Sequence, residues 1–155
     1  MQLQSSYADA VVTMLESSAI ISTSVFQHND AEIGAVVYCE SHSNVTFINS
    51  TFIENNATKD GGVAYIDGGC VVGVHGCVFE NNSALSNGGV FEILAGTLFI
   101  EQSCFSHNQA REGGAISFST SSVETPVIIS ESIFANNSAS FVGGAVAAVN
   151  VTLII

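Results

Sequence analysis

Basic residues are almost missing from this sequence. The 155-residue chain has only Lys59 and Arg111 against fourteen acidic residues, and its formal net charge is −12. Binding to nucleic acids and attraction to anionic lipid surfaces both depend on several Lys and Arg side chains. The sequence therefore argues against nucleic-acid and membrane-surface partners. Charged residues make up only 10% of the chain, so Ser, Thr, Asn and Gly must form much of its surface.

Long apolar runs and targeting signals are also missing. No segment reaches the roughly 18 consecutive apolar residues that a membrane helix needs, so we expect no direct membrane insertion. The first residues lack the basic region and apolar stretch of a secretory signal, and we expect none within this segment. The four cysteines form no Cys-x-x-Cys pair and have no matching histidine spacing, which argues against a zinc site. We expect no cofactor.

What the sequence does contain is an internal repeat. The motif Phe-x-x-Asn-x-Ala, followed by a pair of small residues and an apolar stretch, recurs five times with its phenylalanines 26, 27, 26 and 29 residues apart. These are Phe26, Phe52, Phe79, Phe105 and Phe134. The motif asparagines are Asn29, Asn55, Asn82, Asn108 and Asn137. The small pair is Gly34-Ala35 in the first copy and two glycines in the others, Gly61 and Gly62, Gly88 and Gly89, Gly113 and Gly114, and Gly143 and Gly144.

The residues before each phenylalanine alternate in polarity, which is the period-two pattern of a β-strand. Each unit is predicted to hold two or three short strands and no helix. A unit of about 27 residues cannot bury its apolar side alone, whereas stacked units bury it against one another. We therefore predict an all-β fold, a right-handed parallel β-helix of about five to six coils. It forms one segment over residues 1–155, with repeat cores near 24–38, 50–66, 77–93, 103–118 and 132–148.

Each recurrent position then has a physical role. The phenylalanines are expected to form one interior column. The motif asparagine is expected at a corner, where it tolerates left-handed backbone and its amide bonds to the next coil. The glycine pair allows positive φ or close approach of neighbouring backbone. Both ends of the sequence fall within a coil, so we expect a longer parent protein whose other coils stack on this segment.

The paired motif, Phe-x-x-Asn with Gly-Gly-Ala-Ile or Gly-Gly-Val, resembles the repeat of chlamydial polymorphic outer membrane proteins. The resemblance covers roughly residues 8–155. It implies the β-helical passenger of an autotransporter that acts as an adhesin, with an extracellular or cell-surface location. Similar repeats occur in large surface proteins of microbial eukaryotes. The first copy departs from the pattern because Ala35 replaces the second glycine.

Candidate catalytic and metal-binding residues are few. Glu40 and Asp67 fall at equal distances from their small pairs on neighbouring coils; they are either a weak calcium-binding pair or two solvated acids. Lys59 and Arg111 each precede an acid and a glycine pair, which indicates charge-compensated turns rather than a catalytic base. We expect no catalytic residue and no enzymatic activity.

Histidines, cysteines and tyrosines form three further groups with side chains that can bind metals, form disulfides or contact sugars. His28 and His107 share a register but lie three coils apart, at about 14 Å, which is too far to share a metal. Cys77 and Cys104 are expected to face inward and outward, so a disulfide between them is not predicted. Tyr38 and Tyr65 stand three residues after their small pairs on neighbouring coils and form the only aromatic row suited to a sugar. Glu92 ends that row.

Asparagine acceptors for glycosylation are numerous. Six of the twelve asparagines stand in Asn-x-Ser/Thr, the acceptor sequence for N-linked glycans in secreted proteins. They are Asn44, Asn49, Asn56, Asn81, Asn136 and Asn150. None is a motif asparagine, because alanine always stands two residues after the latter. Glycosylation at these sites is therefore predicted at outward or turn positions.

Two functional hypotheses follow. The first is a structural or adhesive rod segment of a large extracellular or cell-surface repeat protein, which binds a surface protein or glycan by shape and multivalent contacts. The second is a carbohydrate-binding or polysaccharide-cleaving β-helix of the pectate-lyase kind. An exposed groove lined by aromatic residues would favour the second.

Overall fold

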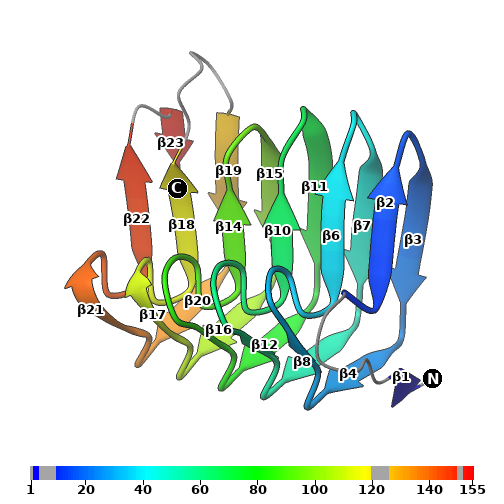
Figure 1. Cartoon of the computed structure of the whole chain (residues 1–155). Helices are drawn as coiled ribbons and strands as arrows, with labels where there is room; N and C mark the ends of the chain where they lie inside the picture. The colour runs from blue at the N-terminus through cyan, green and yellow to red at the C-terminus, as the bar shows by residue number, and fades with distance from the viewer. Residues whose placement is uncertain (1, 4–9, 120–125, 150–151) are drawn as a thin grey trace.

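Four parallel sheets wrap around one common axis (Figure 1). The computed structural model describes residues 2–3, 10–119, 126–149 and 152–155, and these residues contain strands and turns but no helix. Among these described residues, three sheets have six strands and one has five, and every strand pairing is parallel. The predicted parallel β-helix is therefore confirmed.

The strands of sheet A carry the phenylalanines of the motif, and those of sheet D carry its alanines. Sheet A consists of β1 (Gln2–Leu3), β4 (Val25–Gln27), β8 (Thr51–Ile53), β12 (Val78–Glu80), β16 (Cys104–Ser106) and β20 (Ile133–Ala135). Sheet D consists of β5 (Asp30–Ala31), β9 (Asn56–Ala57), β13 (Ser83–Ala84), β17 (Gln109–Glu112) and β21 (Ser138–Val142).

The other two sheets follow the small pair of each repeat. Sheet B consists of β2 (Val12–Leu15), β6 (Val37–Glu40), β10 (Ala64–Ile66), β14 (Phe91–Ile93), β18 (Ile116–Ser119) and β22 (Val146–Val149). Sheet C consists of β3 (Ser18–Ser22), β7 (Asn44–Ile48), β11 (Cys70–His75), β15 (Gly96–Glu101), β19 (Pro126–Ser130) and β23 (Thr152–Ile154).

One coil passes through the sheets in the order A, D, B, C and back to A. Viewed from the N-terminal end, the chain turns clockwise as it recedes, so the solenoid is right-handed (Figure 1). Each coil thus has four short strands, and the prediction of two or three was too low. The motif region alone supplies two of them, because a sharp corner separates the phenylalanine strand from the two-residue strand that carries the alanine.

The phenylalanines of the motif stack in a single column. Neighbouring ring centroids lie 5.2, 4.8, 4.6 and 4.6 Å apart, with interplanar angles of 12° or less. The first four rings are fully buried, and Phe134 packs half-buried against the core. The column joins the apolar side chains of sheets B and C in one continuous core, which gives every coil its main hydrophobic stabilisation.

The motif asparagines form a continuous amide ladder beside this column. The Asn55 side-chain nitrogen donates to Asn82 Oδ1 at 2.9 Å and to the Phe26 carbonyl oxygen at 3.1 Å. The Asn55 backbone N–H donates to the same Asn82 oxygen at 3.0 Å. The other asparagines of the motif are linked in the same way. The first four asparagines are fully buried. Their amides therefore make hydrogen bonds to protein groups in place of the hydrogen bonds to water that they would make when exposed.

The backbone conformation predicted for these asparagines was wrong by one residue. The left-handed position is the residue before each, with φ between 52° and 57° at His28, Glu54, Asn81, His107 and Asn136. The corner turns at this preceding residue, whose side chain points outward. The asparagine itself turns its amide inward, in line with the ladder.

A second ladder runs along the residues two before each phenylalanine. All five residues at these positions are small: Ser24, Ser50, Cys77, Ser103 and Ser132. The Ser24 backbone N–H donates to Ser50 Oγ at 3.2 Å, and the Cys77 N–H donates to Ser103 Oγ at 3.1 Å. Each serine hydroxyl donates in turn to the carbonyl two residues earlier, as Ser103 does to Glu101 at 2.8 Å. Small hydroxyls therefore satisfy the backbone where sheet C bends into sheet A.

The two glycines have different roles in the pairs at 61–62, 88–89 and 113–114. The first has positive φ, for example 66° at Gly61 and 63° at Gly88. The second has ordinary φ, but a Cβ on Gly62 would overlap the carbonyl oxygen of Gly89 on the next coil. A side chain is therefore excluded by conformation at one position and by interlayer contact at the other. Gly113, Gly114 and Gly143 follow the same scheme.

Candidate functional site

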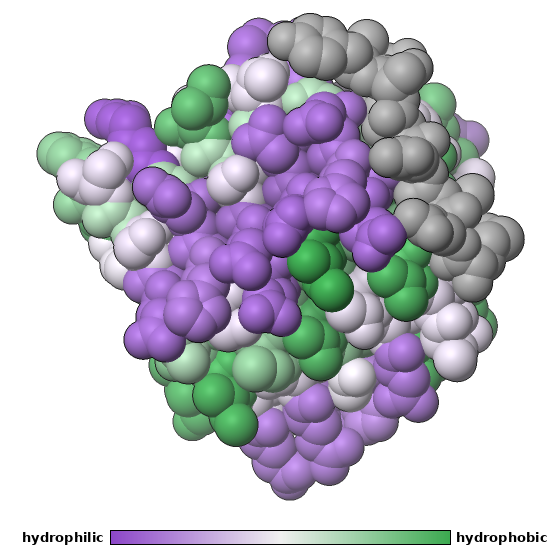
Figure 2. Space-filling model, turned by 90° about the horizontal axis from the view of Figure 1, so that it is seen from below, coloured by the Kyte–Doolittle hydropathy of each residue, from purple (hydrophilic) through white to green (hydrophobic). Residues whose placement is uncertain are grey.

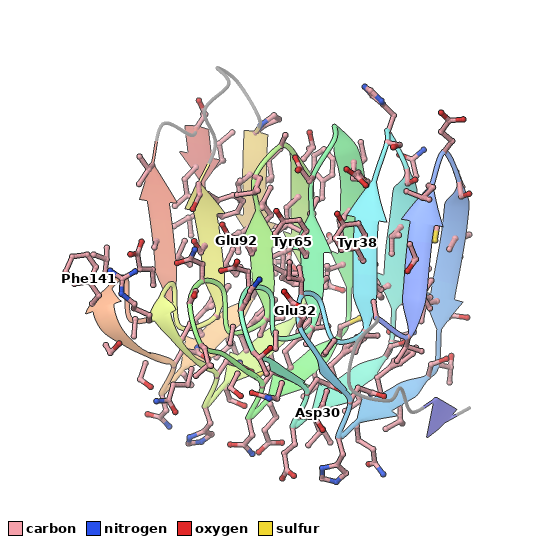
Figure 3. The ribbon with its side chains drawn as sticks, viewed as in Figure 1. Asp30, Glu32, Tyr38, Tyr65, Glu92 and Phe141 are labelled. Atoms are coloured by element: carbon pink, nitrogen blue, oxygen red, sulfur yellow. The ribbon has the colours of Figure 1, made fainter. Side chains whose placement is uncertain are left out.

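The outer face of sheet B brings together most of the residues that the sequence singled out. Tyr38 and Tyr65 pair in register, and Glu92 pairs with Tyr65 on the next strand. Figure 3 shows the three side chains in a row on neighbouring strands. The two tyrosine rings stack with centroids 5.5 Å apart and an interplanar angle of 10°. The aromatic row predicted from the sequence is therefore present, and it is two rings long.

Two carboxylates flank the tyrosine pair. Burial raises the pKa of Tyr38, and the negative charges of Glu40 and Asp67 raise it further. Burial and the Asp67 charge raise the pKa of Tyr65 to about 12. Both phenols therefore keep their protons at neutral pH and act as hydrogen-bond donors.

Glu40 and Asp67 occupy equivalent places on adjacent coils. The Asp67 N–H donates to the carbonyl oxygen of Cys39, the residue before Glu40, at 2.9 Å. One Asp67 oxygen accepts the Gly68 N–H at 2.7 Å, so this carboxylate caps its own turn. Within the described ranges, no group of three or more His, Cys, Asp or Glu side chains gathers at a common point. Since Ca²⁺ takes six to eight oxygen ligands, two carboxylates do not form a calcium site by themselves.

Glu92 is a buried acidic residue, and its burial was not predicted from the sequence. Its side chain is 1% exposed, and neither carboxyl oxygen has a hydrogen-bond partner among the residues that the structure describes. Burial raises its pKa to about 7; the nearby Ser117 and Ser119 hydroxyls oppose this shift, and the charges of Asp60 and Glu112 add to it. The sequence marks Glu92 only as the residue that ends the tyrosine row, and this spacing gives no signal that its side chain is buried.

The two basic residues lie in surface ion pairs. Arg111 pairs with its neighbour Glu112 at 3.0 Å, and its guanidinium also lies over the Phe141 ring, 5.0 Å from the centroid. Lys59 pairs with Glu32 of the preceding coil, although the sequence suggested the adjacent Asp60. The stacking of coils brings Glu32 beside Lys59, and local spacing could not show this. Since both cations are more than half exposed, each pair adds little stability.

The histidines are not brought together. His28 and His107 sit at the same corner of sheet A, on coils separated by β8 and β12. His28 instead pairs with Glu54 of the next coil at 3.0 Å. On sheet C, His75 pairs in the same manner with Glu101 at 3.1 Å. All four cysteines have free thiols; Cys77 is buried and Cys104 is half-buried.

Four of the predicted glycosylation acceptors are exposed: Asn44, Asn49, Asn81 and Asn136. Asn56 differs, because it is half-buried and its amide lies between two coils. Its Nδ2 donates to Asp30 at 3.3 Å, and its Oδ1 accepts the Ser83 hydroxyl at 2.9 Å. Asn150 lies outside the described residues.

The lower side of the solenoid is mixed in character. Figure 2 shows a broad band of hydrophilic residues with small hydrophobic clusters beside it. Exposed apolar residues include Val25, Val78 and Ile133 of sheet A and Leu85, which directly follows β13 of sheet D. No helix in the described ranges has the length and apolar character needed to cross a bilayer. Comparison with protein families, with curated proteins and with solved structures finds no match for this chain.

Proposed function

We propose that this chain is a rod segment of a large extracellular or cell-surface repeat protein, and that it works by adhesive contacts of its outer faces. The observation that carries the proposal is the use of the interior. Phenylalanine, asparagine and serine ladders fill it from coil to coil. Each added coil therefore extends the rod and contributes new outer surface, with no change in the core.

The chemistry of the surface fits this role. Polar residues form a broad band on its lower side (Figure 2), and the two cations are held in ion pairs. Such groups make weak contacts individually, and their combined strength grows with the number of copies engaged. The exposed glycan acceptors support an extracellular location. Lys59 and Arg111, the two candidate catalytic bases, are each held by a carboxylate, Glu32 and Glu112 respectively, which supports a non-enzymatic role.

Multivalency provides the test. The 155-residue chain, biotinylated at one end, is measured as a monomer and as a streptavidin-bound tetramer on immobilised eukaryotic cell-surface protein and glycan. We expect the tetramer to bind at least 100-fold more tightly than the monomer, within the range that avidity supplies. Equal binding of the two forms, or no binding of the tetramer at micromolar concentration, would contradict an adhesive role.

A second candidate function is carbohydrate binding on the outer face of sheet B. It is favoured by the stacked Tyr38–Tyr65 pair beside Glu40 and Asp67. Stacked aromatic rings suit the apolar face of a sugar, and carboxylates accept hydrogen bonds from its hydroxyls. To distinguish binding from cleavage, the chain is incubated with pectic, alginate and glucan substrates, with and without calcium. Reducing ends and unsaturated products are then assayed as the products of cleavage. Turnover that disappears when Glu40 and Asp67 are replaced by Ala would establish an enzyme and refute the non-enzymatic proposal.

A further inference from the structure

A hollow opens on the outer face of sheet C, on the opposite side of the core from the tyrosine pair. The central outward row of this sheet runs Ile20, Thr46, Gly73, Phe99 and Ile128 on successive strands. Gly73 has no side chain, and an open depression of about 400 Å³ lies over this part of the sheet, with Thr46, Phe99, Glu101 and Ser130 among its lining residues. We call this space the Gly73 hollow.

The backbone does not require glycine at position 73. Its φ is not in the left-handed region, and an added Cβ would meet only Thr46 side-chain atoms, the nearest at 3.6 Å, which is ordinary van der Waals contact. Glycine inside a strand is unfavourable, and it often marks a place where a ligand approaches the backbone. This contrasts with Gly62 and Gly89, where a Cβ would overlap the next coil. Gly73 therefore keeps the surface open without serving the fold.

The walls of the hollow are apolar on one side and polar around the rim. The Phe99 ring is 42% exposed, although it lies in a central strand of the sheet. The lining also includes the Thr46 and Ser130 hydroxyls and the His75–Glu101 pair, whose side chains lie 3.1 Å apart. An aromatic face bordered by hydroxyl, imidazole and carboxylate groups matches a pyranose ring, which has an apolar C–H face and hydroxyls at its edge.

Charge narrows the class of sugar. Glu101 lines the hollow and the chain carries a formal charge of −12, so uronic acids and sulfated sugars would be repelled. We propose that the Gly73 hollow binds an uncharged hexose unit of a glycan chain, with the sugar ring stacked on Phe99 and its hydroxyls bonded to Glu101, His75 and Ser130. This inference rests on the proposed role of the outer faces as binding surfaces, and it names a ligand class and a place.

Three substitutions test the site in the 155-residue chain. Gly73→Val fills the hollow with a residue favoured in strands, so we expect unchanged or higher thermal stability and at least a tenfold loss of affinity. Phe99→Ala removes the stacking wall, with the same loss expected. Ile20→Ala is the matched control, because Ile20 is an exposed apolar residue of the same row, two strands from Gly73. Its affinity should stay within twofold of the wild type.

The measurement is saturation-transfer NMR and titration calorimetry with neutral gluco-, manno- and galacto-oligosaccharides, with oligogalacturonate as the charged comparison. Saturable binding of a neutral oligosaccharide that Gly73→Val abolishes would support the inference. Absence of binding at 10 mM saccharide, or binding that survives Gly73→Val, would overturn it. If the tetramer still adheres to cell surfaces while no oligosaccharide binds, this inference is overturned and the adhesive role stands.

Discussion

Glu92 should make the stability of this protein fall as the pH rises from about 4.5 to about 7. Its carboxyl is buried without a hydrogen-bond partner among the described residues, and burial raises its pKa from 4.5 to about 7. The folded state therefore holds a proton between these two values that the unfolded state has already released. Stability consequently decreases from about pH 4.5 to about pH 7 and is level above this interval.

The size of the effect follows from the shift. A difference of about 2.5 pKa units between the two states corresponds to about 3 kcal/mol, since one unit is about 1.4 kcal/mol. The surroundings of Glu92 strengthen the expectation, because the nearby charged groups, Asp60 and Glu112, are acidic as well. Only the Ser117 and Ser119 hydroxyls oppose the shift. Little in this environment stabilises the ionised form.

Glu92→Gln isolates the contribution, because glutamine has nearly the same shape and cannot ionise. Urea unfolding of the wild type and the variant between pH 4 and pH 9 gives the comparison. The variant should match the wild type within about 1 kcal/mol at pH 4.5 and exceed it by about 3 kcal/mol at pH 8. Other acids contribute equally to both proteins and cancel. If the difference between the two proteins does not change with pH, Glu92 does not titrate in this interval and the reasoning is wrong.

Three further predictions concern the ladders and the glycan acceptors. Asn82→Ala should lower the free energy of unfolding by about 1–3 kcal/mol in a urea titration, because the amides above and below it lose partners. The control is Thr58→Ala at an exposed turn position, which should change this free energy by less than about 0.5 kcal/mol. A loss below about 0.3 kcal/mol for Asn82→Ala would refute the role of the ladder. Gly89→Ala should cost more than about 3 kcal/mol or prevent folding, because its Cβ would overlap a glycine carbonyl of the next coil. When the chain is secreted from eukaryotic cells, Asn81→Gln should remove one glycan from the electrophoretic mobility pattern, whereas Asn56→Gln should remove none; loss of a glycan from Asn56 would contradict its place between two coils.

The repeat was sufficient to predict the fold. Phenylalanines 26 to 29 residues apart indicated the length of a coil, and the period-two alternation indicated which side chains face inward. Together these imply parallel stacking in register, and the structure pairs Phe52 with Phe79 accordingly. Spacing reports the position and face of a residue, but it carries no information on φ. For this reason the left-handed corner was assigned to Asn82 and its equivalents, one residue after its actual place at Asn81.

The features of the surface were harder to predict because they depend on neighbouring coils. Lys59 pairs with Glu32, which is 27 residues earlier in the chain. The burial of Glu92 depends on what covers its strand, which no local pattern describes. The hollow at Gly73 was within reach of the sequence, since Thr46, Gly73 and Phe99 each stand six residues before a motif phenylalanine. A register built on the phenylalanines therefore places a glycine between a threonine and an aromatic residue on adjacent strands.

Departures from the repeat are the best guide to function in a solenoid of this kind. Interior positions repeat their chemistry because every coil must satisfy the same core, as Asn55 and Asn82 do with identical bonds. Outward-facing positions are not constrained by core packing, and the residue type at them changes from coil to coil. Examples are the change from Tyr65 to Glu92 on sheet B and from Gly73 to Phe99 on sheet C. A ligand that binds at one specific place on the rod must contact a residue that the neighbouring coils lack at the equivalent position. The interior ladders therefore account for the stability and the length of the rod. Specific binding sites are expected at the outward-facing positions where the residue type changes from one coil to the next.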